Sequence, residues 1–169
     1  MIQSTFSLFR FETRAALGKQ AALDVAATIR ALLAKQPRVR MVFAAAPSQD
    51  EFLAALREDT SIDFGRIDAF HMDEYVGLAP DAPQGFGNFL RVRLFDRVPF
   101  GSVAYINGFA SDTNAACAEY AQALCAAPID IVCMGIGENG HIAFNDPHEA
   151  DLMDPLLVKR VSLDEVCRM

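Results

Sequence analysis

The sequence predicts an α/β fold, specifically a Rossmann-like open and mostly parallel sheet with helices on both faces. Stretches with apolar residues at helical spacing alternate along the chain with short apolar runs. One of these runs, IDIVCMG at 129–135, is apolar at almost every position, which is typical of a parallel strand that is covered on both sides. The chain has 169 residues, of which 52% are hydrophobic, so residues 1–169 suffice for one domain with its own core.

The predicted helices share apolar side chains that recur every three or four positions. They cover residues 13–36, 48–58, 87–97 and 112–126. Pro37 ends the first of them. The second opens on SQDE at 48–51, which we interpret as a capping box, with Ser48 capping the helix and Glu51 reaching back.

The predicted strands are short runs of apolar, β-branched and aromatic residues, and the last of them is assigned on its alternation. They cover residues 39–46, 66–70, 102–106, 129–135 and 156–163. The stretch 71–87 is rich in Pro and Gly and is expected to be a loop.

Composition restricts the partners and the compartment. The formal net charge is −7 without any run rich in Lys or Arg, which disfavours nucleic acid and anionic membranes as partners. The start of the chain lacks the pattern of a signal peptide, and no apolar run reaches 18 residues, so we expect no membrane segment. The four cysteines form no C-x-x-C pair, which favours buried thiols in a reducing cytoplasm.

Ligands of parallel sheets bind beyond the carboxyl ends of the strands, and three stretches are expected there. The first, AAAPSQDE at 44–51, leads from a strand into a helix. Its free backbone N–H groups could bind an anion. It lacks the glycines that let a phosphate approach closely, so on this stretch alone an ordinary strand-to-helix turn is the better explanation.

The second stretch, HMDEYVGL at 71–78, places acids directly after a strand. Asp73 in a partly buried cleft could act as a general base. The alternative is a solvated acidic loop. A metal site built on His71 and Asp73 is a poor interpretation, because nothing nearby completes a ligand set.

The third stretch is GENGHIAFNDP at 137–147. With Gly135 it contains the pattern G-x-G-x-x-G of dinucleotide sites, but such sites require a helix after the third glycine, and Asp146 and Pro147 leave room for at most a turn. The glycines expose His141, and Asp146 follows five residues later. An imidazole oriented by a carboxylate is the usual arrangement for proton transfer.

Taken together, FHMDEYVGL and GIGENGHIAFNDP resemble the glucosamine/galactosamine-6-phosphate isomerase family, and within it the glucosamine-6-phosphate deaminases. The resemblance implies a Rossmann-like fold and the conversion of a hexosamine 6-phosphate into fructose 6-phosphate and ammonia. It implies a small amino-sugar phosphate as the partner, no metal and no organic cofactor, and a monomer or homo-oligomer.

The same resemblance implies the residue roles. Asp73 would take the proton from C2, and His141 would catalyse opening of the pyranose ring with Asn139 and Asp146 as its partners. The loop 45–49 would hold the phosphate through backbone N–H groups, and Tyr75 and Gly77 would shape the pocket. The residues expected to bind substrate are Ala45, Ala46, Ser48, Gln49, Tyr75, Gly77, Gly137 and Gly140.

The sequence departs from the family pattern in three places and in length. Asn139 stands where many deaminases have Asp, Asp146 where many have Glu, and AAAPSQ replaces a glycine-rich phosphate loop. We further expect the chain to lack the family's C-terminal part. Three alternatives stay open at this point: a 6-phosphogluconolactonase, a sugar-phosphate sensor without turnover, and an inactive fragment.

Overall fold

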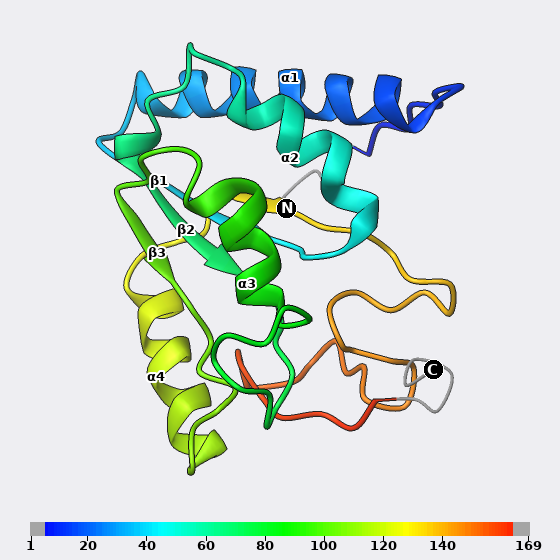
Figure 1. Cartoon of the computed structure of the whole chain (residues 1–169), viewed down its shortest axis with the longest axis vertical. Helices are drawn as coiled ribbons and strands as arrows, with labels where there is room; N and C mark the ends of the chain where they lie inside the picture. The colour runs from blue at the N-terminus through cyan, green and yellow to red at the C-terminus, as the bar shows by residue number, and fades with distance from the viewer. Residues whose placement is uncertain (1–5, 164–169) are drawn as a thin grey trace.

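The computed structural model describes residues 6–163 and has a four-stranded parallel sheet in the order β3-β2-β1-β4 (Figure 1). The strands are β1 Val39–Phe43, β2 Ile67–His71, β3 Ser102–Ala104 and β4 Ile131–Cys133. All three pairings are parallel, with Val39 opposite Ile67 and Phe43 opposite Cys133. The α/β prediction is therefore confirmed.

The helices occur where the apolar spacing places them, with shorter bounds. They are α1 Arg14–Leu33, α2 Asp50–Arg57, α3 Phe86–Leu90 and α4 Thr113–Cys125. A π-helical turn, η3 Arg91–Phe95, continues α3, and short 3-10 turns occupy η1 Pro47–Gln49 and η2 Phe64–Arg66. The side chains of Thr13 and Asp112 cap α1 and α4, because each accepts hydrogen bonds from N–H groups of the first turn.

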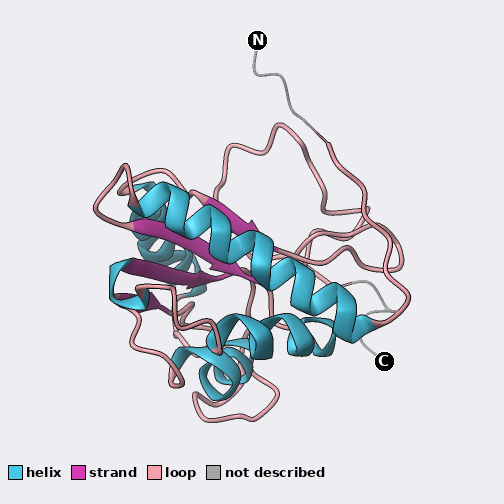
Figure 2. Cartoon of the chain, turned by 90° about the horizontal axis from the view of Figure 1, so that it is seen from above, coloured by secondary structure: helices cyan, strands magenta, loops and turns pink. Residues whose placement is uncertain are grey.

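One face of the sheet carries the hydrophobic core. Alternate β1 residues Val39, Met41 and Phe43 pack there with the buried faces of α1, α2 and the α3–η3 segment. Figure 2 shows α1 running along this face. Gly18 allows α1 and α2 to approach, since a Cβ there would lie 2.6 Å from Cβ of Glu51.

Helix α4 lies on the opposite face and is fixed by two buried side chains. Arg40 of β1 donates to the carbonyl oxygens of Ala123 at 2.5 Å and Leu124 at 3.0 Å, at the C-terminal end of α4. Tyr120 of α4 packs edge-on against Phe70 at 6.0 Å. Helices therefore cover both faces, as predicted.

The predicted capping box is wrong. Helix α2 begins at Asp50 after the turn η1, so Ser48 lies inside that turn, and no side chain caps the helix. Arg14 binds the Glu51 carboxylate through two hydrogen bonds of 2.9 and 2.8 Å. This bidentate pair occupies both oxygens of the carboxylate, so Glu51 does not reach back to the start of the helix.

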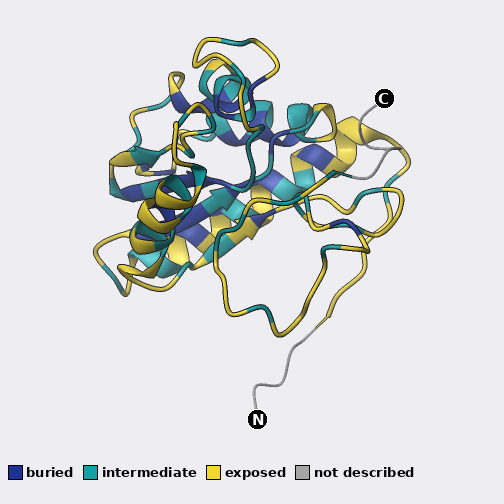
Figure 3. Cartoon of the chain, turned by 90° about the horizontal axis from the view of Figure 1, so that it is seen from below, coloured by how far each residue is buried: buried dark blue, intermediate teal, exposed yellow. Residues whose placement is uncertain are grey.

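The predicted strand at 156–163 is also wrong, because this segment has no strand neighbour to pair with. Its polar groups bond instead to the preceding loop. Lys159 contacts Asp154 at 2.8 Å and the Glu149 carbonyl at 2.8 Å, and the Ser162 N–H donates to the Glu149 carboxylate at 2.9 Å. Figure 3 shows that the long loops are mostly exposed or intermediate, while the buried residues concentrate in the sheet and its helices. Within residues 6–163, no helix is long and apolar enough to span a membrane.

Candidate active site

The carboxyl ends of β1, β2 and β4 bring the three predicted stretches together. The N–H of Ala44 donates to the Cys133 carbonyl at 2.8 Å, and the N–H of Met72 donates to the Phe43 carbonyl at 3.0 Å. A Cβ on Gly135 would lie 3.6 Å from Nε2 of Gln49, so the loops after β1 and β4 are neighbours. The three stretches thus begin side by side at this edge of the sheet, where ligands of parallel sheets bind.

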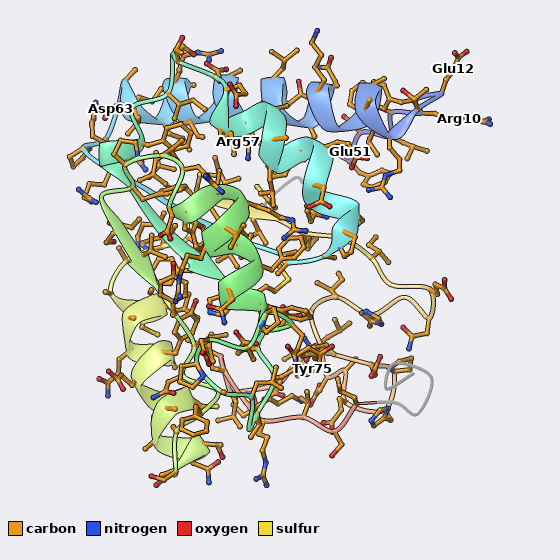
Figure 4. All side chains as sticks on the ribbon, viewed as in Figure 1. Arg10, Glu12, Glu51, Arg57, Asp63 and Tyr75 are labelled. Atoms are coloured by element: carbon orange, nitrogen blue, oxygen red, sulfur yellow. The ribbon has the colours of Figure 1, made fainter. Side chains whose placement is uncertain are left out.

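Aromatic rings join the loop after β2 to the loop after β4. Tyr75 lies with its ring centroid 4.9 Å from that of Phe86 and 5.1 Å from that of Phe144. Figure 4 shows Tyr75 between the end of α3 and the loops of the C-terminal part. Tyr75 therefore forms part of the wall of the site.

Asp73 lines a cavity of about 760 Å³, together with Tyr75 and the loop 143–145. Burial raises the pKa of its carboxyl to about 7, and the neighbouring Glu74 contributes in the same direction. Among the residues that the structure describes, none donates a hydrogen bond to this carboxylate. A desolvated carboxylate with a pKa near neutrality is suited to take up a proton.

Glu74 has a different environment from its neighbour. Its carboxylate accepts hydrogen bonds from the backbone N–H groups of Tyr75, Phe86 and Gly87, at 2.9 to 3.0 Å. These bonds fasten the loop after β2 to the start of α3. The two adjacent acids therefore differ in their surroundings, because the Glu74 carboxylate is held by backbone N–H groups and the Asp73 carboxyl lines the cavity.

His141 lies in a polar network with the two partners expected for it. Its Nδ1 is 2.7 Å from Oδ1 of Asn139 and 3.2 Å from Oδ1 of the buried Asp146. Nδ2 of Asn139 donates to Asp146 at 3.0 Å. Both oxygens only accept, so Nδ1 carries the proton and the lone pair of Nε2 is directed away from the network. The shorter Asp146 reaches the ring.

Two glycines give the loop after β4 its shape. A Cβ on Gly137 would lie 2.2 Å from Cε1 of His141, so the ring packs directly on this residue. Gly140 has a φ of +87°, in the left-handed region that favours glycine. No helix follows Gly140 in the described part of the chain, and the dinucleotide interpretation fails for that reason.

The loop after β1 offers fewer N–H groups than expected. The N–H of Gln49 is donated to the Ala46 carbonyl at 2.8 Å, inside the turn η1. Ala45 is buried, whereas Ser48 is exposed.

Gly77 is exposed on the loop after β2, with a φ of +89° and its N–H donated to the Gly108 carbonyl at 2.8 Å.

The cavity contains only some of the predicted residues. Within the described chain, its lining includes Asp73 and Tyr75 but neither His141 nor the loop 45–49. The structure also adds residues that the sequence analysis missed: Phe144, and the buried His71, which had been considered only as a weak metal ligand. A histidine two residues before the candidate base was the available signal for His71, and the sequence held no comparable signal for Phe144.

Comparison with known proteins shows which proteins this chain is similar to. The family model of glucosamine-6-phosphate isomerases/6-phosphogluconolactonase matches residues 12–158. A glucosamine-6-phosphate deaminase from Lactobacillus helveticus is 43% identical over 89 residues, which cover 53% of this chain and 37% of that protein. One from Arthrobacter sp. is 40% identical over 136 residues, which cover 76% of this chain and 52% of that protein.

Solved structures are similar to this chain as well. A monomeric glucosamine-6-phosphate deaminase is similar with a TM-score of 0.83 at 27% identity, covering 96% of this chain and 67% of that chain. A 6-phosphogluconolactonase from Shewanella baltica shares the fold, with a TM-score of 0.72 at 23% identity, covering 84% of this chain and 61% of that chain. The matches span 37% and 52% of the two deaminases compared above. Because the family model matches most of the chain, from residue 12 to residue 158, the chain belongs to the glucosamine-6-phosphate isomerase/6-phosphogluconolactonase family.

Proposed function

We propose that this protein deaminates a hexosamine 6-phosphate, converting glucosamine 6-phosphate and water into fructose 6-phosphate and ammonia. Two relatives with 40% and 43% identity bear the name of this activity. The observation that carries the proposal is the environment of Asp73. Its carboxyl lines the cavity, and burial raises the pKa of this carboxyl to about 7. Such a group can remove a weakly acidic C–H proton near neutral pH.

The proposed reaction begins with opening of the pyranose ring. Nε2 of His141 moves a proton between the ring oxygen and the anomeric oxygen, while the bond from Nδ1 to Asn139 keeps the ring in the required tautomer. The buried Asp146 carboxylate stabilises the imidazolium that forms when Nε2 is protonated.

Asp73 then acts on the open-chain aldehyde. Its carboxylate takes the proton from C2, the electron pair forms the C1–C2 double bond, and the C1 carbonyl oxygen takes a proton from a water molecule, which gives an enolamine and hydroxide. Return of the proton from Asp73 to C1 leaves an iminium ion at C2. The hydroxide adds to this carbon, its proton moves to the nitrogen, and ammonia leaves as the C2 ketone of fructose 6-phosphate forms.

We place the phosphate at the loop 45–49 and Tyr75 against the sugar. The support is that this loop neighbours the Gly135 turn and that Tyr75 lines the cavity with Asp73. We also propose a cytoplasmic location, because Cys117, Cys125 and Cys133 are unpaired, which suits a reducing compartment. A homo-oligomer stays a prediction.

The test is ammonia release from glucosamine 6-phosphate, coupled to detection of fructose 6-phosphate, for the wild-type chain and Asp73→Asn. We expect release by the wild type and a loss of at least about a hundredfold in the variant, since the amide cannot accept the C2 proton. Exposed Asp81→Asn serves as the matched control. Hydrolysis of 6-phosphogluconolactone that survives Asp73→Asn, without any ammonia release, would contradict the proposal, because a lactonase needs no base at C2.

A further inference from the structure

His71 is the last residue of β2 and is 1% exposed. Both nitrogens of its ring are engaged. Nε2 lies 2.8 Å from the backbone N–H of Ile106, and Nδ1 lies 3.0 Å from the backbone carbonyl of Asp73. An N–H only donates and a carbonyl only accepts, so Nε2 carries the lone pair and Nδ1 carries the proton.

This arrangement makes the ring neutral and immobile. A second proton on Nε2 would face the N–H of Ile106, and burial lowers the pKa of His71, which disfavours that proton further. His71 therefore has no free nitrogen for proton transfer. Its two bonds instead connect the loop that bears Asp73 to the segment after β3.

The backbone of His71 is held as tightly as its ring. The hydroxyl of Tyr120, which is buried on α4, accepts the N–H of His71 at 3.0 Å and donates to the carbonyl of His71 at 2.8 Å. The ring of His71 also packs against two aromatic rings, with its centroid 5.8 Å from that of Tyr105 and 6.2 Å from that of Tyr120. The imidazole is thus fixed by hydrogen bonds and by packing.

We propose that His71 is a positioning residue for Asp73: its Nδ1–H holds the Asp73 carbonyl and thereby keeps the Asp73 carboxylate at the cavity. This inference rests on the proposed function of Asp73 as the base. The carboxylate itself accepts no hydrogen bond from the described residues, so its position is set through the backbone. His71 on one side and Glu74, with its three N–H donors, on the other fix that backbone.

Two substitutions separate the ends of the ring. In His71→Asn the amide nitrogen occupies the region of Nδ1, so it keeps a donor for the Asp73 carbonyl and loses the acceptor for Ile106. In His71→Gln the amide oxygen reaches the region of Nε2, so it keeps the acceptor for Ile106 and loses the donor to Asp73. Each variant removes one hydrogen bond of the same buried side chain, and we expect similar decreases in the thermal unfolding midpoint.

The activity and the titration of Asp73 are then measured in both variants. We expect kcat of His71→Gln to be at least about tenfold below that of His71→Asn, with little difference in KM, because displacement of a catalytic group by about 1 Å costs rate. The carboxyl of Asp73, followed by carbon NMR and assigned with Asp73→Asn, should titrate at lower pH in His71→Gln, since a released loop exposes it to water. The acid limb of the pH–rate profile should move with it.

The inference is overturned if the two variants have equal kcat, or if the Asp73 carboxyl titrates alike in His71→Gln, His71→Asn and wild type. The NMR titration needs no turnover. A wild-type chain that releases no ammonia would therefore contradict the proposed function, and the titration would still test the positioning role of His71. Tyr120→Phe keeps the ring and removes only the hydroxyl that holds the His71 backbone. It should lower the pKa of Asp73, as His71→Gln does. If neither His71 variant folds, an unchanged pKa of Asp73 in Tyr120→Phe overturns the inference instead.

Discussion

Asp73→Asn should make the protein more stable at neutral pH while it abolishes turnover. Burial raises the pKa of Asp73 from 3.8 to about 7, so the folded state binds this proton more tightly than the unfolded chain does. A pKa difference of about 3 corresponds to about 4 kcal/mol of destabilisation once the carboxyl is ionised in both states. The side chain keeps some access to water, so we expect about 2 kcal/mol or more of this to be recovered.

The sign of the pH dependence follows from the raised pKa. Well below pH 3.8 the carboxyl is protonated in both states and has no effect. Between pH 4 and 7 the unfolded chain releases the proton first, so stability falls as the pH rises, and above pH 7 the full cost remains. Asn is neutral at every pH, and it forgoes no hydrogen bond, because the described residues donate none to this carboxylate.

Urea unfolding of wild type, Asp73→Asn and the exposed control Asp81→Asn at pH 4 and pH 8 tests this. The free energy of unfolding of Asp73→Asn should lie close to that of wild type at pH 4 and exceed it clearly at pH 8. The control should follow wild type at both values. If Asp73→Asn unfolds at the same urea concentration as wild type at pH 8, Asp73 is not a desolvated carboxyl and the argument for a base near neutrality fails.

Two further predictions concern the loop after β4 and helix α4. Gly137→Ala should lower ammonia release by about tenfold or more, because the new Cβ would overlap the His141 ring. Gly135→Ala should lose much less activity, because the nearest atom to its Cβ would lie 3.6 Å away. Equal losses in the two variants would contradict this prediction. Arg40→Met should lower the unfolding free energy, measured in urea, by about 2 to 4 kcal/mol, because the last carbonyls of α4 lose their buried donors. The control is Glu58→Gln. Its side chain is 76% exposed, and it should change the unfolding free energy by less than about 0.5 kcal/mol. An Arg40→Met variant as stable as wild type would show that water replaces the guanidinium at that helix end.

The fold class could be predicted because local signals and tertiary structure agree in this chain. The apolar spacing of α1 and the run around β4 each determine an element without reference to distant residues. Bounds were less accurate, and β4 has three residues where seven were expected. A strand ends where its neighbour stops pairing, and that depends on the partner and not on its own residues.

The two wrong elements failed for the same reason. SQDE has the residues of a capping box, but Arg14, 37 positions away, takes the Glu51 carboxylate. Residues 156–163 alternate like a strand, but their hydrogen bonds go to the loop before them. In both cases contacts with residues outside the motif itself, 37 positions away for Glu51 and 10 and 13 positions away for Lys159 and Ser162, outweigh a local preference.

The candidate site was predictable where neighbouring residues define it. Asn139, His141 and Asp146 lie within eight residues, and one turn brings them together. His71 was not assigned its role, because that role depends on Ile106 and Tyr120, which lie 35 and 49 positions away. The aromatic contact of Tyr75 with Phe144 likewise joins two loops that only the sheet brings together.

The environment of Asp73 places two demands on one loop. A carboxyl with a pKa near 7 has to be kept from water, and this destabilises its ionised form. The loop would relieve that cost by moving the carboxylate into solvent, unless other bonds hold its backbone. The bond from His71 to the Asp73 carbonyl and the three N–H bonds of Glu74 oppose this movement. Removing the Asp73 charge and removing the His71 restraint should therefore change stability in opposite directions, while both lower turnover. Asp73→Asn should be more stable than wild type at pH 8 and inactive. His71→Gln should be less stable than wild type and slower. If both variants were destabilised at pH 8, Asp73 would have a structural role in place of the catalytic one.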